Sequence, residues 1–380
     1  MKSQLKPISI LLLCVALGFI SCDKEKKDDT KNLFMALLLN SPRVYGQSGN
    51  LTTSDENKGG VTPNSLNSPY GVAVDAGGVY ITDSGNNRVL YYAWSSTTAT
   101  RVYGQPDFVS STSNNGGVSA TSLSIPRGIA VDAGGVYIAD SPNNRVLYYA
   151  GTSTTATRVY GQPNFTSNTA NRGGANPDAD SLSGPYGVEV DASGVYITEY
   201  WNNRVLYYPG TSTTAIRVYG QGGDFTTAVE NKGGLSANSL RRPYGVAVDA
   251  GGVYIADSQN SRMLYYEGTS TTATRVYGQP NFTSNTVNNG GIGAGSLNTP
   301  SDVFVAAGGI YISDGVNHRV LYYAGTSTTA TRVYGQPDFI SNTANNGGIS
   351  ATSLNWPYGL VLGWGRLFIA DYSNNRVIMY

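Results

Sequence analysis

Residues 43–47 read Arg-Val-Tyr-Gly-Gln, and this phrase returns along the chain at intervals of 57 to 59 residues. Its six copies begin at Arg43, Arg101, Arg158, Arg217, Arg275 and Arg332. A second phrase lies between successive copies. In residues 69–92 it reads Pro-Tyr-Gly-Val-Ala-Val-Asp, Ala-Gly-Gly, Val-Tyr-Ile-Thr-Asp, Ser-Gly, Asn-Asn-Arg-Val-Leu-Tyr-Tyr. A fixed period of this length indicates a fold built from one repeated supersecondary unit.

Each unit has the pattern of four short antiparallel strands. The apolar runs are four to six residues long, rich in Val, Ile and Tyr, and bounded by Gly, Asn, Asp and Pro. This pattern is typical of strands joined by turns, and it shows no helical periodicity. In the first unit the predicted strands are Gly71–Asp75, Val79–Asp83, Arg88–Tyr92 and Arg101–Gln105. Six such units predict an all-β protein, a six-bladed β-propeller, in which radial repetition protects the sheet edges.

The two ends of the repeat region indicate how the ring closes. The first copy of the short phrase, Arg43–Gln47, has no strands before it, and the last unit stops at Tyr380 after its third strand. We therefore expect the N-terminal strand to complete the blade formed by Pro357–Tyr380. A closed ring explains such a split repeat, whereas an open solenoid does not. The propeller is expected to span residues 41–380.

The repeat also resembles the NHL-repeat family of propellers from Ser41 to Tyr380. The resemblance rests on Gly-Val-Ala-Val-Asp, Val-Tyr-Ile-Ala-Asp-Ser and Asn-Asn-Arg-Val-Leu, which recur in register. The chain differs from the usual family unit by about twenty extra residues between blades, such as Pro106–Ile125. Family members that bind RNA are expected to present a basic face. This chain has 25 basic and 25 acidic residues, so we expect no nucleic-acid partner.

The N-terminus resembles a bacterial lipoprotein signal. Two lysines precede an apolar run at residues 8–20 that is too short to span a membrane, and residues 1–21 are expected to be a signal peptide. Cys22 follows at the cleavage point and is the only cysteine left after cleavage, so no internal disulfide competes for it. We expect Cys22 to be lipidated, although Phe19 departs from the usual signal and ordinary cleavage is the alternative.

Residues 22–40 would then tether the propeller to a membrane of the bacterial cell envelope. We favour the outer membrane or the cell surface over the inner membrane. The apolar run at residues 33–39 either packs on the propeller or makes a second membrane contact; we favour packing, because no basic residues follow it. The anchor is the only membrane contact expected, and the propeller is expected to be a monomer.

The long insertions and Asn-rich turns fall on one face, here called the top face, where function is expected. Departures from the repeat mark candidate binding residues there. Blade three has Glu199, Tyr200 and Trp201 where other blades have Asp-Ser-Gly, and blade five has Asp302 in place of glycine. The remaining candidate binding residues lie where the chain enters the inner strand of a blade: Tyr70, Arg127, Tyr186, Tyr244 and Tyr358. Exposed aromatics in a concave mouth could stack on sugars or anchor a protein.

Other repeated residues are expected to be structural. Each insertion has a Ser-Leu near its end and an Asn-x-Gly-Gly turn, and five have a Phe near their start. These apolar residues would hold the insertion on the blades. A calcium loop is the alternative, but the carboxylates are few. The acids that end the second strand are expected to brace turns, with a central cation as the alternative: Asp83, Asp140, Glu199, Asp257, Asp314 and Asp371.

Some six-bladed propellers with related repeats are enzymes, and they belong to two classes. Lyases of this kind place histidines around a metal, and the chain has one histidine, His318, in an Asn position of the repeat. A calcium-dependent lactonase-like hydrolase would need acids that meet in the channel, and Glu189, Glu199 and Asp302 are the candidates. We predict instead a non-catalytic, lipid-anchored scaffold that binds a protein or glycan with its top face. The lactonase-like hydrolase and a purely structural envelope protein are the alternatives. No cofactor is expected, with calcium as the alternative.

Overall fold

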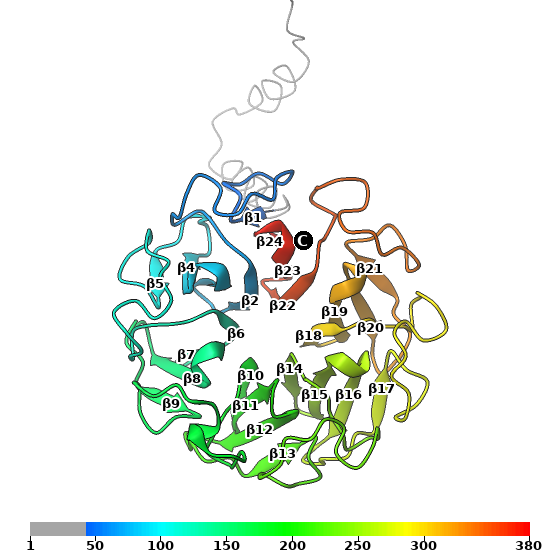
Figure 1. The fold of residues 1–380 in the computed structure, drawn as a ribbon. Helices are drawn as coiled ribbons and strands as arrows, with labels where there is room; N and C mark the ends of the chain where they lie inside the picture. Colours follow the sequence, from blue (N-terminus) through cyan, green and yellow to red (C-terminus); the bar gives the residue numbers. More distant parts are fainter. Residues whose placement is uncertain (1–42) are drawn as a thin grey trace, which may run out of the picture. The chain divides into compact units, whose positions relative to one another are not determined.

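The computed structural model describes residues 43–380, which form a ring of six four-stranded antiparallel sheets (Figure 1). The predicted signal peptide, Cys22, the tether and the apolar run at residues 33–39 lie outside the described residues. Within residues 43–380 no helix has the length and apolar character needed to cross a membrane. The prediction of an all-β six-bladed propeller is confirmed.

Blades 1 to 5 each consist of four consecutive strands. Blade 1 contains β2 (Pro69–Val74), β3 (Gly78–Asp83), β4 (Arg88–Ala93) and β5 (Arg101–Tyr103). Blade 2 contains β6 (Pro126–Asp132), β7 (Gly135–Asp140), β8 (Arg145–Ala150) and β9 (Arg158–Tyr160). Blade 3 contains β10 (Pro185–Asp191), β11 (Gly194–Glu199), β12 (Arg204–Pro209) and β13 (Arg217–Tyr219). Blade 4 contains β14 (Val246–Asp249), β15 (Gly252–Asp257), β16 (Arg262–Glu267) and β17 (Arg275–Tyr277). Blade 5 contains β18 (Pro300–Ala306), β19 (Gly309–Asp314), β20 (Arg319–Ala324) and β21 (Arg332–Tyr334).

Blade 6 joins the two ends of the described chain. It contains β22 (Pro357–Gly363), β23 (Arg366–Asp371), β24 (Arg376–Met379) and, as its outer strand, β1 (Arg43–Tyr45). β1 pairs with β24 in an antiparallel register that places Arg43 opposite Met379 and Tyr45 opposite Val377. The predicted closure of the ring is therefore confirmed, and Figure 1 shows β1 beside β24.

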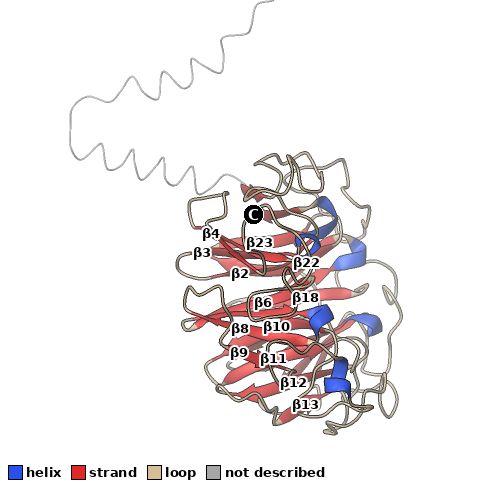
Figure 2. Cartoon of the chain, turned by 60° about the vertical axis from the view of Figure 1, so that its left-hand side comes forward, coloured by secondary structure: helices blue, strands red, loops and turns tan. Residues whose placement is uncertain are grey.

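The short helices lie in the connections. Five of them follow the second strand of a blade: η1 (Ser84–Asn86), η2 (Ser141–Asn143), η4 (Ser258–Asn260), η5 (Gly315–Asn317) and η6 (Tyr372–Asn374). Another, η3 (Ala170–Gly173), lies in the insertion between blades 2 and 3. Figure 2 shows the short helices gathered at one side of the ring, which is the top face.

The hydrophobic core is divided into six clusters, each between two neighbouring blades. In one cluster, Tyr103 at the end of the outer strand of blade 1 packs edge-on against Tyr149 of blade 2, with ring centroids 5.1 Å apart. The same contact recurs around the ring, including Tyr45 with Tyr92 where blade 6 meets blade 1. Such edge-to-face pairs stabilise beyond the area that they bury. The repeated tyrosines therefore hold the blades together.

A buried arginine in each blade ties the insertions to the sheets. Arg88 is fully buried; its Nε donates to Asp83 at 2.7 Å, and its Nη2 donates to the carbonyls of Thr62 and Ser65. Its Nη1 donates to the carbonyl of Phe108, in the next insertion. The remaining blades repeat this arrangement with Arg145, Arg204, Arg262, Arg319 and Arg376. The prediction that the acids ending the second strand brace turns is thereby confirmed.

The insertions are packed as predicted. The leucine near the end of each is fully buried: Leu66, Leu123, Leu182, Leu240, Leu297 and Leu354. The phenylalanines near the start, such as Phe108 and Phe165, are partly buried against the clusters between blades. In the Asn-x-Gly-Gly turn, Asn57 has a left-handed backbone (φ 48°), and its N–H donates to the carbonyl of Leu66. These contacts explain why such long connections are ordered.

Candidate functional site

At the top face the chain enters each inner strand through a residue with left-handed backbone. These residues have φ between 41° and 55°: Ser68, Ile125, Gly184, Arg242, Thr299 and Trp356. For five of these six residues, a side chain of the preceding blade accepts the backbone N–H. Asn87 of blade 1, for example, accepts the N–H of Ile125 at 2.9 Å, and Asn203 of blade 3 accepts that of Arg242 at 2.9 Å. The top face is therefore a rigid platform in which neighbouring blades are hydrogen-bonded.

The single histidine of the chain belongs to this bracing system. His318 takes the Asn position in blade 5, and its Nδ1 accepts the N–H of Trp356 in blade 6 at 3.0 Å. Burial lowers the pKa of His318, which favours the neutral ring that this acceptor role requires. The residue thus acts as a brace between blades.

The predicted aromatic mouth is present, but its rings pack on one another. Tyr70 stacks on Tyr358 with centroids 4.3 Å apart, and Tyr186 lies 5.1 Å from Tyr244. The guanidinium of Arg127 lies over Tyr186 at 4.1 Å and over Tyr70 at 5.0 Å. Because most ring faces are occupied by these contacts, the five predicted residues narrow the mouth of the channel rather than present free stacking surfaces.

One aromatic group extends from this mouth onto the surface. Tyr200 stacks on Tyr186 at 4.5 Å, and the indole of Trp201 meets the edge of Tyr200 at 4.6 Å. The guanidinium of Arg242 lies 5.3 Å from the ring of Tyr200 and 5.4 Å from that of Trp201. Trp201 is 56% exposed, whereas Tyr200 is only 9% exposed. We call Tyr200, Trp201 and Arg242 the blade-three patch.

Glu199, the neighbour of this patch in sequence, is in a different environment. It is fully buried and forms the ion pair with Arg204 that its counterparts form in the other blades. Its carboxylate also accepts the N–H of Ser183 at 2.9 Å and the side-chain amide of Asn202 at 2.6 Å. The structure therefore brings Tyr200 and Trp201 together at the surface and separates Glu199 from them, since its oxygens already have partners.

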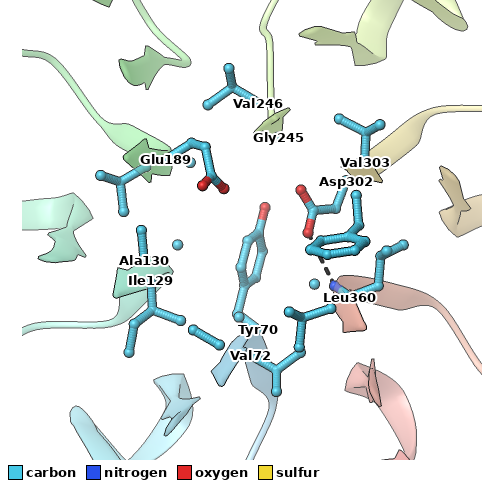
Figure 3. A pocket seen from close by; sticks show the side chains of 18 of the residues that line it. Tyr70, Val72, Ile129, Ala130, Glu189, Gly245, Val246, Asp302, Val303 and Leu360 are labelled. Carbon is cyan, nitrogen blue, oxygen red and sulfur yellow. Dashed lines mark hydrogen bonds between the residues drawn. The ribbon is translucent and has the colours of Figure 1, made fainter. Parts of the chain in front are cut away.

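Asp302 does not lie on the top surface but in the central channel. The channel contains a cavity of about 180 Å³ lined by the inner strands of all six blades. Glu189 of β10 and Asp302 of β18 both line it, together with Tyr70 of β2. Figure 3 shows the two carboxylates turned into the channel and the phenol oxygen of Tyr70 directed into the same space.

Burial dominates the electrostatics of the channel. It raises the pKa of Glu189 to about 8 and that of Asp302 to about 7. Asp302 adds to the rise at Glu189 through charge repulsion, while the N–H of Leu360, which donates to Asp302 at 3.1 Å, opposes the rise there. Both acids therefore exchange protons near neutral pH, as groups at functional sites often do. In residues 43–380 no three or more His, Cys, Asp and Glu side chains are grouped so as to hold a metal ion.

The sequence of the first two blades identifies the repeat. The NHL repeat model matches residues 66–92 and 123–149, which run from the buried leucine through the third strand of blades 1 and 2. The chain is a six-bladed propeller in which two blades match the NHL repeat. No curated protein matches its sequence.

Solved structures share the propeller fold. A protein of unknown function from Bacteroides thetaiotaomicron is similar with a TM-score of 0.58 and 15% identity, over 90% of this chain and 76% of that one. Virginiamycin B lyase from Staphylococcus aureus, solved with quinupristin, has a TM-score of 0.46 and 13% identity over 83% of this chain and 81% of its own. A chain of the nidogen/laminin complex has a TM-score of 0.48 and 15% identity, over 77% of this chain and 93% of its own. The first likeness supports the fold alone, and the other two carry no argument at these TM-scores.

Several residues at the site were not identified from the sequence. Tyr372 of blade 6 occupies the same repeat position as Tyr200 and contacts Tyr358 edge-on at 4.9 Å. Arg242 completes the blade-three patch from the next blade. Both are departures from the repeat, so a full comparison of the six units would have drawn attention to them.

Proposed function

We propose that the NHL propeller is a non-catalytic binding scaffold that captures a protein or glycan at its top face. The observation that carries this proposal is the blade-three patch, where an exposed indole is held rigidly by a tyrosine and an arginine. Tryptophan, tyrosine and arginine are the residues that most often dominate binding energy at interfaces. An exposed indole face is also a stacking surface for a sugar ring.

The position of the patch supports this function. It lies at the channel mouth on the face that carries the insertions, where long loops on a rigid scaffold usually hold binding residues. Tyr200 is locked between Tyr186 and Trp201, so its side chain loses little freedom when a ligand binds. At the two corresponding positions the other blades have Ser-Gly, Ser-Pro, Ser-Gln, Gly-Val and, in blade 6, Tyr372 followed by Ser373. Only blade 3 therefore has a tryptophan beside the tyrosine at this place in the repeat.

The repeat itself supplies variants that test the proposal. Tyr200→Ser and Trp201→Gln install the residues that blade 4 has at these positions, Ser258 and Gln259, so both variants are expected to fold. Binding of the purified protein to arrayed bacterial and host polysaccharides, and to envelope proteins, would be compared with the parent protein. We expect each variant to lose binding by about tenfold or more.

A matched control removes an exposed apolar residue away from the patch. Val109 is 65% exposed in the insertion after blade 1, and Val109→Ser should leave binding unchanged. Equal binding by Tyr200→Ser, Trp201→Gln and the parent protein would refute the site. If no specific ligand is found, a purely structural envelope role becomes the better proposal.

Lipid anchoring through Cys22 is part of the same proposal and rests on the sequence. We expect the mature protein to fractionate with membranes and to carry acyl chains on Cys22, measurable by mass spectrometry of its N-terminal peptide. Cys22→Ser should release the protein from the membrane fraction.

A calcium-dependent lactonase-like hydrolase is the second candidate function. One observation favours it, namely that Glu189 and Asp302 both line the channel cavity. Glu199, the third acid considered for such a site, is held by Arg204 and is not available. Hydrolysis of simple lactones in the presence of calcium, abolished by Asp302→Asn, would establish this function in place of the scaffold.

A further inference from the structure

The channel contains three polar groups without strong partners. Among the described residues, the carboxylate of Glu189 accepts only the N–H of its neighbour Val190, at 3.2 Å. That of Asp302 accepts backbone N–H groups only, from Leu360 at 3.1 Å and from its neighbour Val303. The pKa values of Glu189 and Asp302 are affected by other acids and by backbone N–H groups, and by no arginine or lysine among the described residues. Tyr70 is only 5% exposed, and its hydroxyl has no hydrogen-bond partner among the described residues. Buried polar groups of this kind usually have a partner.

The space between these groups is large enough for an organic ligand. The cavity of about 180 Å³ exceeds the volume of a single bound ion and equals that of roughly six waters. Apart from the two acids and Tyr70, its walls are largely Val, Ile, Leu, Ala and Gly, including Val72, Ile129 and Leu360. An apolar wall with a few convergent polar groups is the usual composition of a small-molecule site.

We propose that the channel binds a small primary alkylammonium ion between Glu189, Asp302 and the hydroxyl of Tyr70. The carboxylates would accept the ammonium N–H groups and balance its charge, and the phenol oxygen would accept a third. The alkyl part would lie against Val72, Ile129 and the other apolar residues of the wall. Glu189, Asp302 and the hydroxyl of Tyr70 would then each have a partner in the cavity.

A divalent metal ion fits the cavity less well. Calcium takes six to eight oxygen ligands, and the side chains here supply two carboxylates and one phenol. The described residues contain no group of three or more acids, histidines and cysteines arranged around a metal position. The apolar walls would also leave much of an ion's hydration shell without partners. Calcium is therefore a competing outcome of the experiment.

The acids make the site sensitive to pH. Both must be ionised to bind an ammonium ion well, and their pKa values are raised to about 8 and about 7, whereas an alkylammonium stays charged up to about pH 10. The charged groups that act on Glu189 are Asp302 from β18 and Asp191 of its own strand. Blade 2 lines the cavity with residues 128–131, which are all uncharged, and blade 4 lines it with Tyr244, Gly245 and Val246. Burial raises the pKa of Tyr244 above its ordinary value, so this phenol stays neutral over the range of the experiment. Affinity should therefore rise from pH 6 to pH 9.

In the experiment the full chain is titrated with n-butylammonium chloride and with n-hexylammonium chloride. Calorimetry measures the binding, and thermal melting measures the stabilisation. We expect saturable binding that stabilises the protein and tightens about fourfold per added methylene until the cavity is full. The neutral alcohols n-butanol and n-hexanol serve as matched ligands without charge, and calcium chloride is tested separately. Binding of the alcohols as tightly as the amines would overturn the proposal, as would binding of calcium alone.

The repeat again supplies conservative variants. Glu189→Ala installs the residue of Ala73, Ala130 and Ala247 at this position, and Asp302→Gly installs the glycine of the other five blades. Each should weaken amine binding at least tenfold and flatten its pH dependence, whereas Trp201→Gln should leave it unchanged. Equal amine binding by the parent protein and Glu189→Ala would refute the site. Because Trp201 and the channel are tested separately, the two proposals can fail independently.

Discussion

Arg145 shows how much a single buried residue holds together in this propeller. Its Nε pairs with Asp140 at 2.7 Å, and its Nη2 donates to the carbonyls of Ser119 and Ser122 at 2.9 Å. Its Nη1 donates to the carbonyl of Phe165 in the following insertion. One guanidinium thus satisfies a buried acid and two loops, which a lysine could not do because it lacks the planar fork of donors.

Arg145→Met is predicted to destabilise the protein strongly. It leaves the Asp140 carboxylate and three carbonyls without their donor, and breaking a buried pair in this way typically costs about 3–5 kcal/mol. Urea unfolding followed by fluorescence measures the change. As a control, Lys232→Met breaks the half-exposed pair with Asp224 and should cost under about 1 kcal/mol. Similar losses in the two variants would contradict the role assigned to the buried arginine.

Glu189 is predicted to make the ligand-free protein less stable as pH rises. The ordinary pKa of a glutamate is 4.5, and burial raises that of Glu189 to about 8 in the folded chain. Between these values the folded state holds a proton that the unfolded state has lost, so stability falls by up to about 1.4 kcal/mol per pH unit. Asp302 acts in the same direction between pH 3.8 and about 7.

The measurement is urea unfolding of the parent protein and of Glu189→Ala at several values between pH 5 and pH 8. As pH rises, the free energy of unfolding should fall in the parent protein and fall less in Glu189→Ala. The stability of the variant relative to the parent protein should therefore increase with pH. Parallel pH dependences would show that Glu189 is not buried uncharged. An alkylammonium ligand should reduce the loss in the parent protein at pH 8.

At the scale of single elements, the strands were readily predicted and the side-chain directions were not. Val, Ile and Tyr between Gly and Asp turns predicted the four strands of the first blade to within one or two residues, as β2 (Pro69–Val74) shows. Whether Tyr70 faces solvent or its neighbours depends on where the six inner strands meet, which no local pattern encodes. The same limit explains why Asp302 and Glu189, more than a hundred residues apart, were not placed opposite one another.

Leu182→Ala is predicted to loosen the insertion between blades 2 and 3. Leu182 is fully buried in the cluster between these blades, and its removal should cost about 2–5 kcal/mol. Hydrogen exchange should accelerate most at the amides of residues 163–181, which this leucine holds on the sheets. Val109→Ala, at an exposed position in another insertion, should change neither stability nor exchange. Unaltered exchange in Leu182→Ala would show that other contacts order the insertion.

At the scale of the whole molecule, the ring limits its exposed sheet edges. Each blade ends in an outer strand of only three residues, such as β5 (Arg101–Tyr103) and β21 (Arg332–Tyr334). Short edge strands are poor templates for pairing with another molecule. In blade 6 this protection depends on β1, because β24 would otherwise be the edge.

Val44→Asp is predicted to open blade 6 and to cause self-association. Val44 is 3% exposed in the cluster between blades 5 and 6, so a carboxylate there would be buried without a partner and β1 would detach from β24. Val218→Asp places the same charge in β13, the outer strand of blade 3, which the chain holds at both ends. Light scattering after gel filtration should show oligomers for Val44→Asp alone. A monomeric Val44→Asp would indicate that β1 is not needed to cover β24.

The seam in blade 6 also means that chain order and ring order are separable. The end of β24 and the start of β1 stand in the same relation as β8 and β9, which residues 151–157 connect. Because Tyr380 corresponds to Tyr149, a copy of residues 150–157 inserted between Tyr380 and Arg43 would close the polypeptide into a continuous circle. New termini could then be placed in the turn between the last two strands of any other blade. Such circular permutants should fold into the same propeller, with the N- and C-termini in the blade chosen for the new break.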